Sequence, residues 1–377
     1  MGQDDMVLVT GGAGFIGSYV VDALVAKGYS VRIFDSLEPQ VHGESQTAPG
    51  YLNPAAELVI GDVRDRSALR DALEGVGVVF HYAAAVGVGQ SMYQIQRYVD
   101  SNTLGGATLL DILANEQHHV RKLLVASSMS IYGEGKYECE ECGVDYPQLR
   151  SGVQLRERHW EMLCPRCGGE MRPLPTDEDK PLHPTSIYAV TKRDHEEMFL
   201  LFGRAYDIPA VALRFFNVYG PRQALSNPYT GVAAIFSARL LNGEPPVIYE
   251  DGQQSRDFIH VQDVARASVL AMERPEADYE VFNVGTGRPL TIRQIAQVLI
   301  ERLAGGKLEP QIVGQYRQGD IRHCFADIAR IREKLGFQPE VSFEDGVADL
   351  ISWVREQEAI DGFHEVDREL RRKELIV

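Results

Sequence analysis

The sequence has no apolar run of the roughly 20 residues that a helix needs to span a bilayer. Its N-terminus also lacks the basic region and apolar core of a secretory signal, because a short apolar stretch at Met6–Val9 follows almost at once. Basic charge is in deficit as well, with 38 Lys and Arg residues against 54 Asp and Glu residues. Sequence-independent binding of DNA or RNA depends on basic surface. We therefore expect a cytoplasmic protein that binds neither a membrane nor a nucleic acid.

Cysteine is scarce, and its placement is unlike that of a disulfide-rich scaffold. Two C-x-x-C pairs are separated by 21 residues, and each pair is followed directly by a glycine. This spacing predicts a four-cysteine zinc ribbon with a structural metal, because four thiolates close the coordination sphere. Two disulfides or a redox pair remain the alternatives. The four cysteines are Cys139, Cys142, Cys164 and Cys167.

Short apolar runs alternate with helix-length amphipathic stretches over the first 130 residues, which predicts an α/β fold with a doubly wound parallel sheet of the Rossmann type. The alternation stops between residues 134 and 178, where the cysteine pairs lie, and this segment is interpreted as an inserted zinc ribbon. Strands are expected at 6–10, 30–35, 57–62, 76–85, 122–127, 210–214 and 279–285. Helices are expected at 17–27, 100–115, 188–201 and 292–303.

A glycine-rich loop joins the first strand to the first helix. Such glycines allow a tight turn and let a pyrophosphate approach the positive N-terminus of the helix. Asp35 closes the second strand, where a carboxylate binds ribose hydroxyls and repels a 2′-phosphate. Asp35 therefore favours NAD over NADP. The loop residues assigned to NAD binding are Gly11, Gly14, Phe15, Ile16 and Gly17.

Asp62 and Val63 follow the third expected strand and are placed to meet the adenine. An Asp in this position serves equally well as a helix cap, and the sequence does not separate the two roles.

Tyr188 and Lys192 stand one helical turn apart, on one face of a helix. A neighbouring ammonium favours the phenolate and so lowers the pKa of the tyrosine toward a value suited to a general base. Ser128 follows the fifth expected strand, at the sheet edge where ligands bind in such folds. The sequence predicts that these three residues are catalytic.

Taken together in chain order, these motifs resemble those of nucleotide-diphosphate-sugar epimerases and dehydratases, within the extended short-chain dehydrogenase/reductases. The resemblance covers nearly the whole chain outside the cysteine-rich segment. The runs that carry it, beside the glycine loop, Asp35 and the Tyr188/Lys192 pair, are SSMSIYG at 127–133, RFFNVYGPR at 214–222 and RDFIHVQD at 256–263.

The resemblance implies roles for individual residues. Tyr188 is then the base, Lys192 holds the nicotinamide ribose, and Ser128 hydrogen-bonds the substrate hydroxyl. Asn217 binds the substrate, with a turn-capping amide as the alternative. Arg256 and Arg322 are diphosphate clamps, since an arginine fork suits phosphate oxygens; solvated surface arginines are the alternative.

The resemblance also implies a domain organisation and an assembly. An NAD-binding domain at 1–216 contains the insertion and is expected to regain residues 250–275. A smaller α/β domain that binds the nucleotide sugar comprises 217–249 and 276–377. A homodimer is expected through the Tyr188 helix and the 100–115 helix.

Met129 and Ser130 follow Ser128 where dehydratases of the family carry an acidic pair. Neither side chain transfers a proton near neutral pH, so dehydration and decarboxylation are disfavoured. C4 epimerisation, by transient oxidation and return of the hydride, remains the simplest reaction. A nucleotide-sugar reductase, a 3,5-epimerase/reductase and a non-catalytic NAD-bound scaffold are the alternatives.

The insertion, with the run at 126–135, is similar to that of a group described as dTDP-L-rhamnose 4-epimerases. It precedes Tyr188 along the chain, in a region that borders the active-site mouth in the family. The insertion therefore props or lids the sugar pocket, or it serves only stability or dimer contacts; the sequence leaves both open.

Overall fold

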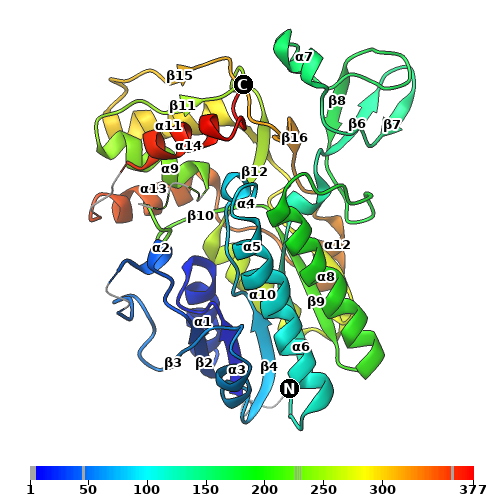
Figure 1. The fold of residues 1–377 in the computed structure, drawn as a ribbon, viewed down its shortest axis with the longest axis vertical. Helices are drawn as coiled ribbons and strands as arrows, with labels where there is room; N and C mark the ends of the chain where they lie inside the picture. Colours follow the sequence, from blue (N-terminus) through cyan, green and yellow to red (C-terminus); the bar gives the residue numbers. More distant parts are fainter. Residues whose placement is uncertain (1–5, 45–46, 226, 228, 230, 358–360) are drawn as a thin grey trace.

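Seven parallel strands form the central sheet of the computed structural model, which describes residues 6–44, 47–225, 227, 229, 231–357 and 361–377 (Figure 1). The strand order is β13-β9-β5-β4-β1-β2-β3, so the expected doubly wound Rossmann-type sheet is confirmed. The strands are β1 (Met6–Thr10), β2 (Ser30–Asp35), β3 (Glu57–Ile60), β4 (Val76–His81), β5 (Lys122–Ser128), β9 (Ala210–Phe215) and β13 (Val281–Val284).

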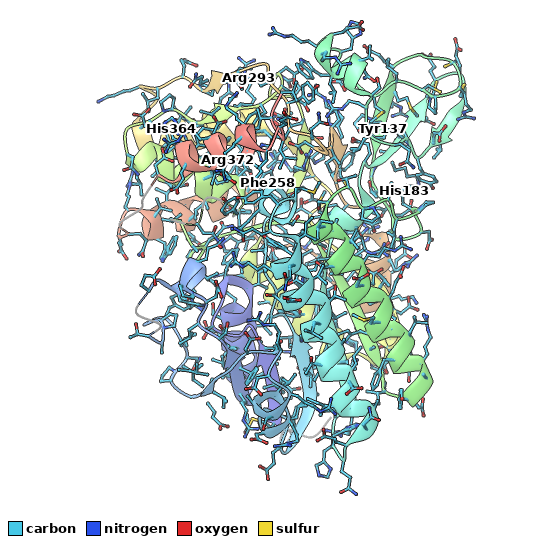
Figure 2. The ribbon with its side chains drawn as sticks, viewed as in Figure 1. Tyr137, His183, Phe258, Arg293, His364 and Arg372 are labelled. Carbon is cyan, nitrogen blue, oxygen red and sulfur yellow. The ribbon has the colours of Figure 1, made fainter. Side chains whose placement is uncertain are left out.

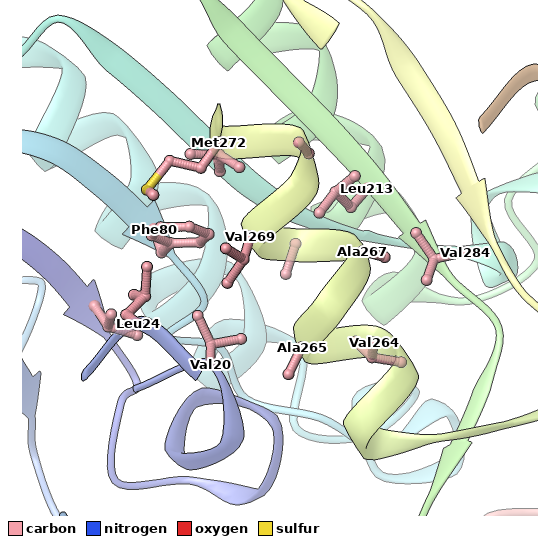
Figure 3. Packing of buried hydrophobic residues seen from close by; sticks show 14 of the residues in the cluster. Val20, Leu24, Phe80, Leu213, Val264, Ala265, Ala267, Val269, Met272 and Val284 are labelled. Carbon is pink, nitrogen blue, oxygen red and sulfur yellow. The ribbon is translucent and has the colours of Figure 1, made fainter. Parts of the chain in front are cut away.

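Helices cover both faces of this sheet because its strands are apolar on both sides. One face carries α1 (Phe15–Ala26), α10 (Val261–Glu273) and α12 (Ala329–Leu335). The other carries α3 (Arg66–Ala72), α6 (Gly105–Asn115) and α8 (Ile187–Tyr206). Figure 3 shows Val269 and Met272 of α10 near Phe80 of β4, with Val20 and Leu24 of α1 beside them.

The smaller domain has its own core, built on a four-stranded sheet. That sheet contains β10 (Asn217–Tyr219), β12 (Ser255–His260), β14 (Pro289–Thr291) and β16 (His323–Cys324). A two-stranded sheet adds β11 (Val247–Ile248) and β15 (Gln311–Ile312). The helices around them are α9 (Val232–Leu241), α11 (Ile292–Ala304), α13 (Phe343–Val354) and α14 (Phe363–Arg372).

The expected domain boundary at residue 276 is wrong. β13 completes the large sheet by pairing in parallel with β9, and α12 packs its Ile331 and Leu335 on the same core. Of the segment expected to return to the large domain, α10 does so, whereas β12 joins the four-stranded sheet. The chain therefore crosses between the domains more often than the sequence suggested.

The insertion projects from one end of the molecule, at the upper right of Figure 1. It is a three-stranded antiparallel sheet in the order β7-β6-β8, with one short helix. Its elements are β6 (Lys136–Cys139), β7 (Gly143–Asp145), α7 (Gly152–Arg156) and β8 (Met171–Leu174).

The helix expected at 100–115 begins differently, because residues Val99–Leu104 form a wide π-helical turn before α6. The Asn102 side chain explains this turn, since it is fully buried and bonds both backbone groups of Ala85 at 2.7 and 3.1 Å and Thr191 Oγ1 at 2.9 Å. The remaining short helices are α2 (Pro39–His42), α4 (Val88–Ser91), α5 (Ile95–Tyr98) and the 3-10 turns Met129–Tyr132 and Pro275–Ala277. Among the residues described, no helix has the length and apolar character required to cross a membrane.

Candidate active site

A cavity of about 630 Å³ lies at the carboxyl ends of the parallel strands and extends to the smaller domain. Ligands bind at this edge in doubly wound folds because the loops and helix N-termini converge there. The predicted site residues that line the cavity are Gly11, Gly14, Phe15, Ile16, Gly17, Asp35, Asp62, Val63, Ser128, Tyr188, Lys192, Asn217 and Arg256. The structure thus brings all but one of the predicted dinucleotide, catalytic and substrate residues to a single cavity.

The glycine loop is as tight as the sequence suggested. Gly11 has a φ of +71°, and a Cβ there would lie 2.7 Å from the backbone nitrogen of Ala83. A Cβ on Gly17 would lie 2.2 Å from the carbonyl oxygen of Gly11. The helix α1 that follows has no side-chain cap, so its first N–H groups are available to a phosphate.

The Asp35 carboxylate is fixed by two backbone amides, Ala13 N at 3.0 Å and Leu37 N at 2.9 Å. These bonds hold the carboxylate beside the glycine loop, where further acceptor sites remain for ribose hydroxyls. The negative charge at this point disfavours a 2′-phosphate. This geometry fits NAD.

Asp62 is not the helix cap that the sequence left open. The cap of α3 is Asp65, whose side chain accepts from the amides of Ser67 and Ala68. Asp62 instead pairs with Arg64 in the cavity wall, and this hydrogen-bonded pair lowers the pKa of the Asp62 carboxyl.

Tyr188 and Lys192 lie in the first turns of α8, which begins after the capping serine Ser186. The buried Lys192 Nζ donates to the Ala126 carbonyl oxygen at 3.0 Å. Ser130 was not predicted as a site residue, yet its Oγ lies 2.9 Å from Ser128 Oγ in the cavity wall. Its residue type gave no signal, because the contact depends on the 3-10 turn that follows β5.

Burial dominates the protonation of this pair. It raises the pKa of Tyr188 to about 12, against a smaller lowering by the Ser128 side chain. It lowers the pKa of Lys192 to about 7. The structure therefore does not bear out the expected lowering of the Tyr188 pKa by Lys192.

On the substrate side, the buried Asn217 Oδ1 borders the cavity and has no hydrogen-bond partner among the residues that the structure describes. A buried unpaired acceptor is costly, so this amide is suited to a ligand and is not the turn cap considered above. Arg256 also lines the cavity. Its two terminal nitrogens donate to the carbonyl oxygens of Ser255, Ile321 and Arg322 and to Asp320, which leaves its Nε–H for a ligand.

Arg322 does not fit the predicted clamp role. Its guanidinium is fully buried away from the cavity lining and is bound by Glu161, Glu250 and Asp251. Because these three carboxylates accept its N–H groups, the Arg322 guanidinium has no donor left for a diphosphate.

Arg317, which the sequence reasoning missed, lines the cavity instead of Arg322. Its guanidinium lies 4.4 Å from the Tyr249 ring centre, and its buried Nε has no partner within the described residues. The resemblance pointed to Arg322, whereas Arg317 is placed by a single antiparallel bridge with Ile376 near the C-terminus.

The four paired cysteines come together in the insertion, with all Sγ atoms within 4.8 Å of one another and no disulfide among them. Gly143 and Gly168 adopt φ angles of +77° and +78°, as expected for glycines that close two knuckles. This donor set fits a tetrahedral metal bound by thiolates. No residue from 134 to 178 is found among the described residues that line the cavity, so the insertion is not a lid in this structure.

The sequence from residue 7 to 151 and from 167 to 285 matches the family described as NAD dependent epimerase/dehydratase. The chain belongs to that family. The break in the match falls inside the insertion. The resemblance predicted from the motifs is thereby confirmed, and the protein is an NAD-dependent isomerase of the epimerase class.

Among curated relatives, dTDP-L-rhamnose 4-epimerase of Burkholderia thailandensis is 34% identical, with 93% of this chain and 95% of the relative covered. The structure of UDP-glucose 4-epimerase of Thermotoga maritima with UDP-glucose has a TM-score of 0.75 at 33% identity, covering 93% of this chain and 99% of the other. UDP-glucuronic acid 4-epimerase of Bacillus cereus, with UDP-glucuronic acid and NAD, gives 0.75 at 28% identity, with 93% and 99% covered.

Proposed function

We propose that the protein interconverts dTDP-L-rhamnose and its C4 epimer, using bound NAD that is unchanged after each turnover. The observation that carries the proposal is that Ser128, Tyr188 and Lys192 line one cavity with the glycine loop and Asp35. The sugar identity is supported by the 34% identical relative of that name. Met129 and Phe216 add apolar wall to the cavity, which suits the methyl group of a 6-deoxyhexose.

Some of the side chains bind the substrate and the cofactor, and others transfer the proton. Arg256 and Arg317 hold the diphosphate, and Asn217 hydrogen-bonds the nucleotide sugar. Ser128 orients the sugar 4-hydroxyl, and Tyr188 removes its proton and returns it after the sugar has turned about the diphosphate. Lys192 holds the nicotinamide ribose, Asp35 the adenosine ribose, and Asp62 and Val63 the adenine.

NAD, when bound, supplies a positively charged nicotinamide ring that accepts the C4 hydrogen and favours the Tyr188 phenolate. This charge opposes the effect of burial, which raises the pKa of Tyr188 to about 12. Neither Met129 nor Ser130, the residues after Ser128, can act as an acid or a base near neutral pH. A dehydratase reaction therefore lacks its proton donor at this place.

We also infer that the four cysteines hold one structural Zn²⁺. The Sγ cluster and its two knuckle glycines support this assignment. Metal analysis of the purified protein is expected to give one zinc per chain.

We further infer a homodimer formed by α8 and the helices beside it. Val190 and Leu201 lie eleven residues apart, on one side of α8, and remain exposed. Val99 and Leu104, in the π-helical turn next to α8, are exposed as well. Together these side chains form an apolar face of the kind that a second copy covers.

The test incubates the purified protein with dTDP-, UDP- and GDP-sugars without added cofactor and follows C4 inversion by NMR. We expect inversion of dTDP-L-rhamnose in preference to the other sugars. Tyr188→Phe should reduce kcat by about 10³-fold or more, with NAD still bound. Tyr206→Phe, an exposed tyrosine on the same helix, is the matched control. A requirement for stoichiometric NADPH, or full activity of Tyr188→Phe, would contradict the proposal.

A further inference from the structure

The insertion contacts the body of the protein through a network of buried and half-buried charged side chains. Arg150, almost fully buried, forms a two-bonded pair with Glu250 at 2.8 and 2.9 Å. Glu250 and Asp251 both bind Arg322, at 3.1 and 2.7 Å. Glu161 closes the network from the insertion side, binding Arg322 and His323 Nε2, the latter at 3.1 Å.

The insertion also binds the backbone of this segment. Glu134, at the base of the insertion, accepts the amides of Arg322 at 2.9 Å and His323 at 2.8 Å. The Tyr137 hydroxyl accepts the His323 amide at 3.1 Å and donates to Glu134 at 2.6 Å; Figure 2 labels this tyrosine within the insertion. Carboxylates that accept backbone amides are strong partners, so residues 322–323 are held in both main chain and side chain.

The same segment holds Arg256. The Arg322 and Ile321 carbonyl oxygens accept from the Arg256 guanidinium, and Asp320 accepts at 3.2 Å. His323 Nδ1 lies 2.8 Å from the hydroxyl of Ser255, the residue before Arg256. Two routes therefore lead from Glu161 to Arg256, one through Arg322 and one through His323.

We infer that the inserted ribbon is a positioning element for substrate binding, which fixes residues 320–323 through Glu134, Arg150 and Glu161 and so holds the Arg256 guanidinium toward the nucleotide diphosphate. The inference rests on the proposed role of Arg256 and goes beyond it, since no inserted residue lines the cavity. An arginine that is already oriented loses less entropy on binding a phosphate, so the effect falls on affinity and not on the proton transfer at Tyr188.

The first experiment compares Glu161→Gln with Glu138→Gln in the full-length protein with NAD bound. Both residues lie in the insertion and pair with an arginine, but Glu138 pairs with Arg172 on the outer surface. Calorimetry with dTDP and with UDP, and kinetics with the epimerised sugar, provide the readouts. Glu161→Gln is expected to weaken binding of the preferred nucleotide and raise KM about tenfold, with kcat within twofold and NAD content unchanged. Glu138→Gln is expected to match the wild type.

A double variant tests whether Glu161 acts on nucleotide binding through Arg256. In an Arg256→Ala background, Glu161→Gln is expected to cause less than a twofold further loss of nucleotide affinity, because residues that act through one another are not additive. The inference would be overturned if the losses of nucleotide affinity from the two single substitutions multiply in the double variant. It would also be overturned if Glu161→Gln binds the nucleotide as tightly as the wild type.

Treatment with a mercurial reagent and a chelator, which removes the metal proposed for the four cysteines, gives an independent measurement. We expect weaker dTDP or UDP binding with the NAD content of the protein unchanged, and unchanged affinity would again overturn the inference. Failure of the wild-type protein to bind either nucleotide or to epimerise any sugar would instead contradict the proposed function.

Discussion

The Ser130 hydroxyl is expected to orient Ser128 through one hydrogen bond. Its hydroxyl lies 2.9 Å from Ser128 Oγ, and its amide donates to the same oxygen at 3.2 Å. We expect Ser130→Ala to leave Ser128 less well oriented and to lower kcat about fivefold, the value of roughly one hydrogen bond. Steady-state kinetics should show KM unchanged. Ser130→Thr, which keeps the hydroxyl, should recover the activity; a Thr variant as slow as the Ala variant would contradict this role.

The pKa of Glu161 predicts how the stability contributed by the network between the insertion and the body depends on pH. The hydrogen bond from His323 and the nearby Arg322 lower the pKa of Glu161 from 4.5 to about 2, although partial burial acts the other way. A carboxylate with a depressed folded-state pKa stabilises above its unfolded pKa, and this stabilisation is lost as the pH falls toward about 2.

Urea unfolding of the wild type and Glu161→Gln is the measurement for this pH dependence. The difference in their free energies of unfolding should be constant above about pH 5 and shrink between pH 4.5 and 2. Glu250, Asp251, Arg322 and His323 face the group, and Gln preserves its shape among them. A difference that does not change with pH would show that the Glu161 carboxylate is not bound as described.

Most of the candidate site could be predicted from sequence because its residues carry local signals. Glycines before a helix, an acid after a strand and a Tyr-x-x-x-Lys turn each report their own geometry. Arg317 and Arg322 carry no such signal, because they are five residues apart on one segment and only tertiary pairing decides which faces the cavity. The resemblance therefore pointed to Arg322, whereas the structure places Arg317 at the cavity.

At the scale of elements, the charge-rich C-terminal segment does more than form a solvated surface helix. Leu370 of α14 is buried, lines the cavity and packs against Tyr249. Tyr316 and Val377 exchange two backbone bonds, at 3.1 and 3.0 Å, beside Arg317. The tail thus forms the outer wall next to this arginine.

Deletion of residues 361–377 is expected to raise KM for the nucleotide sugar by more than tenfold, because Arg317 loses the backbone pairing with Ile376 and Val377 that places it. NAD binding should be retained, since the glycine loop and Asp35 lie in the other domain. Kinetics and cofactor content of the purified deletion variant check this. An unchanged KM would show that Arg317 does not depend on the tail.

Strand and helix positions in the large domain follow from apolar periodicity, and most were expected within a few residues of where they lie. Two features escaped this reasoning. The π-helical turn depends on the burial of Asn102 against Ala85 and Thr191, contacts that no periodic pattern encodes. β13 was predicted as a strand but assigned to the wrong domain, because three apolar residues and an Asn do not identify the strand that they pair with.

At the scale of the whole molecule, the exposed apolar face on α8 predicts the assembly. We expect Val190→Asp with Leu201→Asp to yield monomers, since each substitution places a charge at the centre of the proposed interface. Analytical ultracentrifugation at several concentrations is the measurement. Ile60→Asp, an equally exposed apolar residue on β3, is the control and should sediment as the wild type does. A dimer that survives both α8 substitutions would place the interface elsewhere.

The position of β13 at the edge of the large sheet has a practical meaning for anyone who wishes to dissect the enzyme. A gene fragment encoding only residues 1–216 would express a sheet whose β9 lacks its hydrogen-bonded neighbour and whose α1 face lacks α10 and α12. Bare strand edges and uncovered apolar faces recruit other chains, so such a fragment should precipitate. We therefore expect the NAD-binding domain to complete its fold only after most of the smaller domain has been synthesised.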